Sequence, residues 1–301
     1  MSLLVTGSIG IDTVEAPTGR VDDALGGSSI YFAYAASFFS PVRLVGVVGE
    51  DCPRDFLSPL HANSRIDMSG LEVRAGSKTF RWHGRYHDDV NDRDTVNVEL
   101  NVLAERGPSI PEKFRDSRYV FLANSHPDLQ MELLGKLAQP ALVVADTMDL
   151  WIHNERDTLM QLIRRLDGLV LNDGEAKLLT GEANVVAAGL ELMQYVREFI
   201  VIKKGEHGAL LFTGTKVYAI PSYPTFCVID PTGAGDSFAG AMMGYLAAQD
   251  DVSNGTLRRA IAYGTVTASI GIEGFSLAKF FQATRGEIDK RMSEFEELVR
   301  F

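Results

Sequence analysis

The hydrophobic positions of this chain fall into short runs that alternate with longer segments in which they recur every three or four residues. The short runs are rich in Val, Ile and Leu and predict buried strands, at Leu3–Thr6, Arg43–Val48, Tyr119–Leu122, Leu142–Ala145, Leu169–Leu171 and Phe199–Ile202. The longer segments have the period of an amphipathic helix, as in Ile30–Phe39, Asp157–Leu166 and Val185–Arg197. Because strands that alternate with helices are typical of a mostly parallel sheet covered on both faces, we predict a three-layer α/β/α sandwich.

The C-terminal third of the chain has a different pattern. Ala209–Phe212 and Lys216–Ile220 flank the turn Thr213-Gly214-Thr215, which predicts a β-hairpin. Three helical segments follow, near 234–249, 256–270 and 285–300. We therefore expect the sheet to end in an antiparallel edge, within a single domain over residues 1–301.

One segment in the first half lies outside this scheme. Thr79–His87 alternates residue types as a strand does, a polar run follows from Asp88 to Thr95, and Val96–Val102 is strand-like again. We predict that residues of about 72–103, joined by about 12–25, form a small β-sheet lid over the carboxyl ends of the parallel strands, where open α/β sheets bind ligands. An ordinary surface hairpin is the alternative.

Composition limits the classes of partner. The formal net charge of −11 and the sequence pI near 5.1 disfavour binding to nucleic acid or to an anionic membrane surface. Cys52 and Cys227 are far apart and lack metal-ligand spacing, so we expect no disulfide framework and no zinc site. The chain has no run of roughly 18 apolar residues and no basic region before Leu3, so we expect a cytoplasmic protein without a membrane span.

The segment that carries the most chemical information is D-P-T-G-A-G-D-S-F-A-G at residues 230–240. Apolar residues recur at helical spacing after it, so its turn lies at the start of a helix, where unpaired N–H groups and the helix dipole attract anions. Gly233, Ala234 and Gly235 are therefore the predicted anion hole for the γ-phosphoryl group of a nucleotide. Asp236 follows this turn and is the predicted base that takes a proton from an attacking alcohol.

Acidic and glycine residues near the N-terminus are candidates for the acceptor site. Asp12 follows the first strand, and a carboxylate there can bind two hydroxyl groups of a polyol, although a turn-capping role is the alternative. Asp51 follows the second strand in the same way. Gly26, Gly27 and Ser28 precede a helix, where backbone N–H groups could meet a sugar, although the same letters also describe a plain helix start.

Two later strand ends carry residues suited to a nucleotide. Asn172 and Glu175 stand three residues apart at a predicted helix start and could organise the water shell of Mg²⁺, which prefers oxygen ligands. A capping box explains that spacing equally well. Lys204, Gly205 and Gly208 follow the next strand and could bring a positive charge and close backbone contact, and a simple hairpin turn is the alternative.

In this order, the motifs G-x-x-x-x-D, GG, V-G-x-x-G-x-D, N-x-x-E, K-x-G and D-P-T-G-A-G-D strongly resemble the ribokinase-like family of sugar and nucleoside kinases, also called the PfkB family. The resemblance extends from Gly7 to about Ser276 and implies the ribokinase-like fold with ATP and Mg²⁺. It implies that Asp236 is the catalytic base beside the Gly-Ala-Gly anion hole. The other residues that it implies are Asp12, Gly26, Gly27 and Asp51 for the acceptor, Asn172 and Glu175 for Mg²⁺ and phosphates, Lys204, Gly205, Gly208, Tyr263 and Gly264 for the nucleotide, and Asp230 and Thr232 for a monovalent cation such as K⁺.

The chain departs from the family pattern after the double glycine, where Tyr31 replaces an Asn that commonly bonds a sugar hydroxyl. An aromatic residue at this place, together with Phe32, Phe80, Trp82 and Tyr86, leaves room for a nucleoside, and a place in the core is the equal alternative for these residues. We expect transfer of the γ-phosphoryl group of ATP to a hydroxymethyl oxygen of a sugar, with a nucleoside acceptor as the alternative. The same residues are also compatible with an ADP-dependent kinase and with a catalytically silent sugar or nucleotide sensor.

The predicted lid raises two further expectations. His83, Arg85 and His87 could recognise a phosphate on the acceptor, or be solvated. Related kinases pair through their lid strands, so we expect a homodimer through the lid, which would also cover an exposed strand edge. Asp146 follows a strand near the same cleft, and we assign it no role from the sequence.

Overall fold

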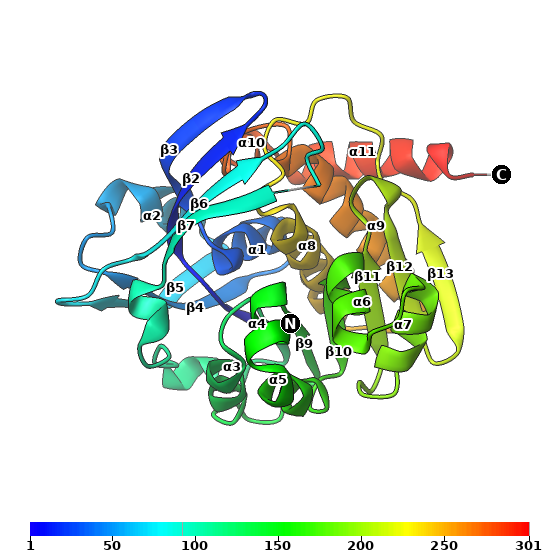
Figure 1. The fold of residues 1–301 in the computed structure, drawn as a ribbon, viewed down its shortest axis with the longest axis horizontal. Coiled ribbons are helices and arrows are strands. Elements are labelled where there is room, and N and C mark those ends of the chain that lie inside the picture. The colour runs from blue at the N-terminus through cyan, green and yellow to red at the C-terminus, as the bar shows by residue number, and fades with distance from the viewer. Residues whose placement is uncertain (92, 301) are drawn as a thin grey trace.

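The computed structural model describes residues 1–91 and 93–300. The strands of its large sheet are β1 (Leu3–Thr6), β4 (Val42–Gly49), β5 (Ile66–Arg74), β8 (Tyr119–Leu122), β9 (Leu142–Asp146), β10 (Gly168–Asn172), β11 (Phe199–Lys203), β12 (Ala209–Thr213) and β13 (Lys216–Ile220). The nine strands lie in the order β13-β12-β11-β10-β9-β8-β1-β4-β5 (Figure 1). Within this spatial order, all neighbouring strands from β11 across to β5 pair in parallel. β12 pairs antiparallel with both β11 and β13, which confirms the predicted hairpin edge.

Helices cover both faces of this sheet. They are α1 (Ser28–Ser37), α2 (Arg54–Ala62), α3 (Pro127–Leu134), α4 (Asp149–Asn154), α5 (Arg156–Ile163), α6 (Asp173–Thr180), α7 (Val185–Leu192), α8 (Ala234–Gln249), α9 (Asn254–Gly271), α10 (Ala278–Gln282) and α11 (Arg285–Leu298). One core lies between the sheet and the layer that contains α1, α8 and α9, and a second lies under α3 and α5 to α7. Strand side chains alternate between these two cores, which is why the strands are apolar on both faces and why the predicted three-layer sandwich is confirmed.

A second, smaller sheet stands beside the carboxyl ends of the parallel strands. It has the order β3-β2-β6-β7 and is built from β2 (Gly10–Ala16), β3 (Gly19–Gly26), β6 (Phe80–Tyr86) and β7 (Arg93–Glu99). The predicted lid segment 72–103 also included the end of β5. That end pairs with β4 in the large sheet as far as Gly49 and Arg74, so the second chain segment of the small sheet begins at Phe80, later than predicted.

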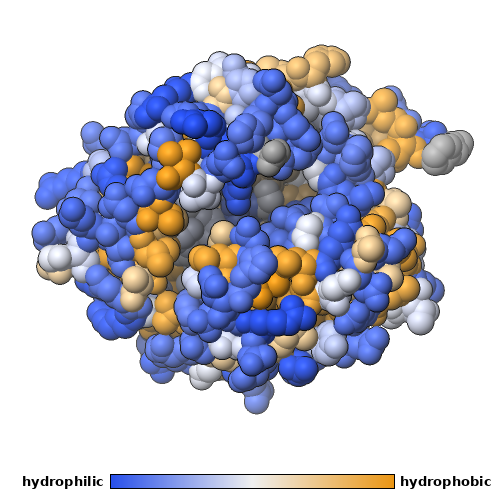
Figure 2. Space-filling view, in the orientation of Figure 1, coloured by the Kyte–Doolittle hydropathy of each residue, from blue (hydrophilic) through white to orange (hydrophobic). Residues whose placement is uncertain are grey.

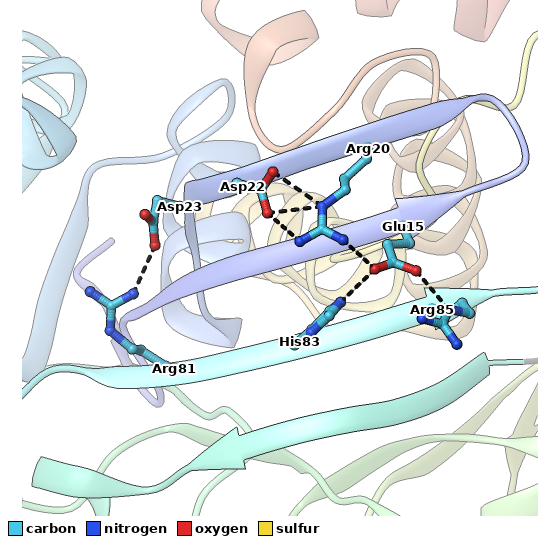
Figure 3. A network of polar contacts seen from close by, with 7 residues as sticks. All are labelled: Glu15, Arg20, Asp22, Asp23, Arg81, His83 and Arg85. Atoms are coloured by element: carbon cyan, nitrogen blue, oxygen red, sulfur yellow. Dashed lines mark hydrogen bonds and ion pairs between the residues drawn. The ribbon is translucent and has the colours of Figure 1, made fainter.

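The small sheet has two chemically different faces because side chains alternate along a strand. Asp12 and Trp82 are cross-strand neighbours on the face toward α8, which we call the inner face. Glu15 lies on the opposite, outer face, where it accepts hydrogen bonds from Arg20 and Arg85 at 2.5 and 2.6 Å (Figure 3). A sequence candidate for phosphate recognition, Arg85, therefore points away from the site. His83 and His87 also have acidic neighbours, Glu15 and Asp94, each at 3.0 Å.

The described part of the chain contains no helix with the length and apolar character that a membrane crossing requires. Cys52 and Cys227 are both free cysteines, and Cys227 is the more exposed of the two.

Candidate active site

The N-terminus of α8 lies near the middle of the view in Figure 1, where Figure 2 shows the surface hollowed beside the small sheet. Gly233 precedes the helix and has a φ of 73°, in the left-handed region that favours glycine. A Cβ at this position would lie 2.3 Å from Cγ of Tyr31, whose buried ring packs against the turn. Two independent constraints therefore require glycine at 233. Tyr31 supports the turn from the core, and its contact with the acceptor stays a prediction.

The turn presents backbone donors at the start of α8. The Ala234 N–H donates to the carbonyl oxygen of Pro231 at 3.1 Å, so this amide is already satisfied. In the part of the chain that the structure describes, the N–H groups of Gly235 and Asp236 have no protein acceptor. These two amides, at the positive end of the helix dipole, are the donors available to an anion.

Asp236 lies in the first turn of α8, beside these donors. Burial raises the pKa of its carboxyl group, and the positive charges of Lys203 and Arg93 oppose that rise. The Nζ atom of Lys203 lies 2.6 Å from the place that a Cβ on Gly235 would occupy, so the lysine head group sits directly on the turn. A carboxyl group whose pKa is raised, next to N–H groups that are available to an anion, is suited to accept a proton from an alcohol.

Adjacent strand ends bring further polar groups to this place. Asp146, Asn172 and Lys203 are the last residues of β9, β10 and β11, which pair in parallel register. Strand alternation directs all three toward the α8 side of the sheet. Asp146 is buried, and among the described residues its Oδ1 atom has no hydrogen-bond partner. Burial and the neighbouring Asp236 raise the pKa of Asp146 well above its usual value.

Asn172 and Glu175 form the capping box that the sequence allowed as an alternative. The Asn172 N–H donates to Oε2 of Glu175 and the Glu175 N–H donates to Oδ1 of Asn172, both at 2.7 Å. Burial raises the pKa of Glu175, and Lys203 opposes that rise. The pair is thus held rigidly at the start of α6 and directed toward the same lysine as Asp146 and Asp236.

The predicted nucleotide residues after β11 form a tight turn. The Lys204 N–H donates to the Gly208 carbonyl oxygen at 2.7 Å, and Gly208 has a φ of 81°. Gly205 also has a positive φ, of 54°, and a Cβ there would lie 2.3 Å from Oδ1 of Asn91 at the tip of the small sheet. Lys203, and not the predicted Lys204, has its side chain at the start of α8. Lys203 is the last residue of β11, and its side chain is on the side of the sheet that faces α8.

Asp12 lies on the inner face of the small sheet and is 4% exposed. A Cβ on Gly26 would be only 1.8 Å from its Oδ2 atom, so the carboxylate rests on the bare backbone of that glycine. Its other oxygen, Oδ1, is buried and has no hydrogen-bond partner in residues 1–91 and 93–300. Burial raises the pKa of Asp12 to about 7, with smaller increases from Asp230 and Asp236. Gly27, which follows Gly26 and precedes α1, has a φ of 102°, in the region that favours glycine.

Two other predicted acceptor residues are engaged in the protein's own structure. The Ser28 hydroxyl accepts from the Ser8 N–H at 3.1 Å, which ties the start of α1 to the loop after β1. Oδ1 of Asp51 accepts from the N–H and the hydroxyl of Thr79 at 2.7 and 2.8 Å, at the junction with the small sheet. Both side chains therefore connect neighbouring segments of the fold, and their contact with an acceptor stays a prediction.

Tyr263 lies away from the start of α8, whereas Gly264 packs beside its second turn. Tyr263 stacks on Tyr245 at 4.8 Å and donates to Oδ1 of Asp289 at 3.0 Å. Tyr245 is nine residues after Asp236, which is about 13 Å along the helix. Gly264 allows α9 to pack on α8, since a Cβ would lie 2.8 Å from the Phe238 carbonyl oxygen. The structure thus gives both predicted nucleotide residues packing contacts.

Asp230 and Thr232 brace the loop before α8. Oδ1 of Asp230 accepts from the Thr232 N–H at 2.9 Å, and its Oδ2 accepts from the Ser276 N–H at 3.1 Å. The Thr232 hydroxyl donates to the hydroxyl oxygen of Tyr86 at 3.2 Å. This bond joins the loop to the inner face of the small sheet.

The inner face carries an aromatic surface beside Asp12. The Trp82 indole lies over Gly84, where a Cβ would be 2.0 Å from Cη2, and its Nε1–H donates to Oγ1 of Thr95 at 3.3 Å. The guanidinium carbon of Arg93 lies 5.4 Å from the centroid of this ring. The flat ring, the cation and the Asp12 carboxylate therefore share one surface.

Sequence reasoning missed three charged residues of this site: Arg93, Asp146 and Lys203. Strand parity could have selected Lys203, because it shares the spacing of the buried Phe199 and Val201. Asp146 had the same signal as Asp51, a carboxylate at a strand end. Arg93 lies in a polar run that has no distinguishing pattern.

The chain is similar to known proteins in sequence and in fold. The family model for pfkB family carbohydrate kinases matches residues 14–280. A cytidine kinase from Thermococcus kodakarensis is 32% identical over 249 residues, which cover 81% of this chain and 87% of that protein. The structure of Burkholderia thailandensis nucleoside kinase in complex with inosine matches with a TM-score of 0.78 at 20% identity and covers 99% of both chains. Methanocaldococcus jannaschii nucleoside kinase matches with a TM-score of 0.77 at 19% identity, over 97% of this chain and 98% of that one.

The structural matches confirm the predicted ribokinase-like fold, with its large parallel sheet and its additional small sheet. The family match covers most of the chain and includes the turn at the start of α8. The chain therefore belongs to the pfkB family carbohydrate kinases and is a phosphotransferase with an alcohol group as acceptor.

Proposed function

We propose that this kinase transfers the γ-phosphoryl group of ATP to the hydroxymethyl oxygen of a nucleoside. The observation that carries the proposal is the pairing of Asp12 with Trp82 on the inner face of the small sheet. A buried carboxylate with a free oxygen suits the two hydroxyl groups of a ribose, and a flat ring on the neighbouring strand suits a planar base. The cytidine kinase relative supports the same acceptor class. A simple sugar, the acceptor expected from the sequence, would bind the Asp12 carboxylate but has no planar base to place against the Trp82 ring.

Binding of the acceptor supplies partners that Asp12 lacks. Two hydroxyl groups that donate to its oxygens would stabilise the ionised form, which burial now disfavours. Gly26 allows the carboxylate to lie flat, and Trp82 would cover the base from the small sheet. The acceptor's hydroxymethyl group would then extend toward Asp236 at the start of α8.

In the transfer step, the acceptor oxygen forms a bond to the γ-phosphorus as the bond from that phosphorus to the ADP oxygen breaks. Asp236 takes the proton of the acceptor hydroxyl. The N–H groups of Gly235 and Asp236 and the Nζ of Lys203 stabilise the negative charge on the transferring group. The small sheet acts as a lid that excludes water, so that ATP is not hydrolysed.

Oxygen donors in the site fit Mg²⁺. Oδ1 of Asp146 is buried without a partner among the described residues, and Glu175, which the capping box holds in place, is near enough for its charge to raise the pKa of Asp146. Among the described residues, no group of three or more acidic, His or Cys side chains could hold a metal ion by itself, so these two would hold Mg²⁺ through water and the nucleotide phosphates. When bound, the ion neutralises phosphate charge. Asp230 and Thr232 remain the predicted contacts of K⁺.

The acceptor assay tests this proposal. ADP release with Mg²⁺-ATP is measured against cytidine, other nucleosides, pentoses, hexoses and sugar phosphates, with K⁺ or Na⁺. Higher kcat/KM for nucleosides than for every sugar supports the proposal, and turnover confined to sugars would reject it. Turnover only when ADP replaces ATP would identify an ADP-dependent kinase. Binding of nucleotide or acceptor without turnover would favour the sensor.

We also propose that two copies pair through the lid, in a cytoplasmic enzyme. The edge strand β7 is exposed along its whole length and carries Val96 and Val98 at 45% and 48% exposure. Unpaired strand edges with apolar side chains are suited to association. Light scattering at working concentration tests the pairing, and a monomeric mass would count against it.

A further inference from the structure

The small sheet brings one cation to the inner face, Arg93 at the start of β7. It is the direct cross-strand neighbour of Tyr86, and its guanidinium group lies against the Trp82 ring. Within residues 1–91 and 93–300, no carboxylate oxygen lies within 4.0 Å of its nitrogens, in contrast to Arg81 and Arg85 on the outer face, which pair with Asp23 and Glu15. Arg93 is thus the arginine of this sheet that is directed toward the reaction.

A hydrogen bond determines where Arg93 stands relative to α8. Tyr86 is 7% exposed, and its hydroxyl accepts from the Thr232 hydroxyl at 3.2 Å. Thr232 precedes Gly233, the residue that starts the turn before α8. Because Arg93 and Tyr86 are paired across the strands, this bond holds the arginine at the mouth of the anion-binding turn.

The charges around this space agree with that position. Burial raises the pKa values of Asp12, Glu175 and Asp236, and the positive charge of Arg93 opposes the rise at each of them. These three carboxyl groups belong to different elements of the fold. Arg93 therefore faces the volume that these carboxylates surround, which is where the transferring phosphate must lie. A phosphate that enters among several acidic groups requires nearby cations, and Lys203 supplies only one from the large sheet.

We propose that Arg93 is a further catalytic residue that contacts the transferring phosphoryl group, and that Tyr86 positions it through Thr232. As the acceptor oxygen bonds to the γ-phosphorus and the bond to ADP breaks, the guanidinium N–H groups donate to the non-bridging oxygens. The hydroxyl proton still goes to Asp236. Because Arg93 belongs to the small sheet, transfer requires this sheet to be closed, which limits transfer to water. The inference rests on phosphoryl transfer and holds for a sugar or a nucleoside acceptor.

The test compares Arg93→Met with Arg85→Met, a matched substitution on the outer face. Arg93→Met is expected to lower kcat on the order of 10²-fold while calorimetry finds ADP affinity unchanged, and Arg85→Met is expected to keep wild-type kcat. Arg93→Lys retains the positive charge, and its kcat is expected to lie between those of Arg93→Met and Arg85→Met. Free guanidinium ion is expected to restore part of the activity of Arg93→Ala and none to Asp236→Asn. Restoration also excludes misfolding as the cause of the loss.

Tyr86→Phe tests the positioning role. It removes the hydroxyl but keeps the ring, so it is expected to lower kcat on the order of 10-fold without change in nucleotide affinity. In Arg93→Met, the same change is expected to have almost no further effect, because the group that Tyr86 positions is gone. Independent, multiplicative losses would overturn the positioning role. Equal kcat for Arg93→Met and wild type, or a change only in acceptor KM, would overturn the catalytic one, whereas a wild-type enzyme that phosphorylates only sugars would refute the nucleoside proposal alone.

Discussion

Replacement of Asp12 by asparagine is expected to stabilise the ligand-free protein at neutral pH while it weakens acceptor binding. The Asp12 carboxyl group is buried beside Asp230 and Asp236, which raises its pKa from 3.8 to about 7. An asparagine has nearly the same shape but carries no charge at any pH. The substitution therefore removes the cost of ionising a buried acid and leaves the packing on Gly26 in place.

The magnitude follows from the difference between the two pKa values. Between pH 4 and pH 7 the folded protein keeps the Asp12 proton and the unfolded chain has lost it, so stability falls as pH rises. Above pH 7, Asp12 is ionised in both the folded protein and the unfolded chain, and the loss of stability has reached its full value. Three pKa units correspond to about 4 kcal/mol, of which about 3 kcal/mol accrues between pH 5 and pH 8.

Urea unfolding of the ligand-free protein at pH 5, 6, 7 and 8 measures this effect. The free energy of unfolding of Asp12→Asn, relative to wild type, is expected to increase by about 3 kcal/mol from pH 5 to pH 8. Asp23→Asn, at an exposed carboxylate, is the matched control and is expected to show no such increase. A relative stability of Asp12→Asn that stays constant over this pH range would refute the reasoning.

Three further outcomes are expected. Asp236→Asn should lower kcat on the order of 10²-fold or more with nucleotide affinity retained, as measured by steady-state kinetics and calorimetry; unchanged kcat would remove Asp236 from the base role. Gly26→Ala should raise the acceptor KM on the order of 10-fold, because the new methyl group displaces the Asp12 carboxylate, while ADP affinity stays the same; an unchanged KM would count against Asp12 as an acceptor contact. Near pH 6.5, acceptor binding should release a proton from Asp12, so the calorimetric enthalpy should differ between buffers of different ionisation enthalpy, and buffer-independent heats would contradict this linkage.

Local patterns in the sequence were enough to predict most of the large sheet. β1, β8 and β13 have the predicted bounds, β9, β11 and β12 extend one residue further at one end, and β4 and β10 extend one residue further at each end. These strands are buried on both faces, so their apolar runs are continuous and stand out from the polar segments between them. β5 was not predicted, because it is an edge strand of mixed burial whose pairing with β4 depends on contacts across the sheet.

Motif order and turn chemistry determined, from the sequence alone, the family and the groups at the start of α8. The positive φ at Gly233 and the position of Asp236 in the first turn are local properties that glycine and helix periodicity specify. Tertiary structure decided which charges meet there. Lys203, Asp146 and Arg93 come from β11, β9 and β7, and their proximity depends on strand register, on the side of each strand that faces α8 and on how the small sheet folds over it. Tertiary packing also determined the surroundings of Tyr31 and Tyr263. Burial against a neighbouring helix or turn depends on the packed chain, and an aromatic residue in the sequence does not by itself indicate it.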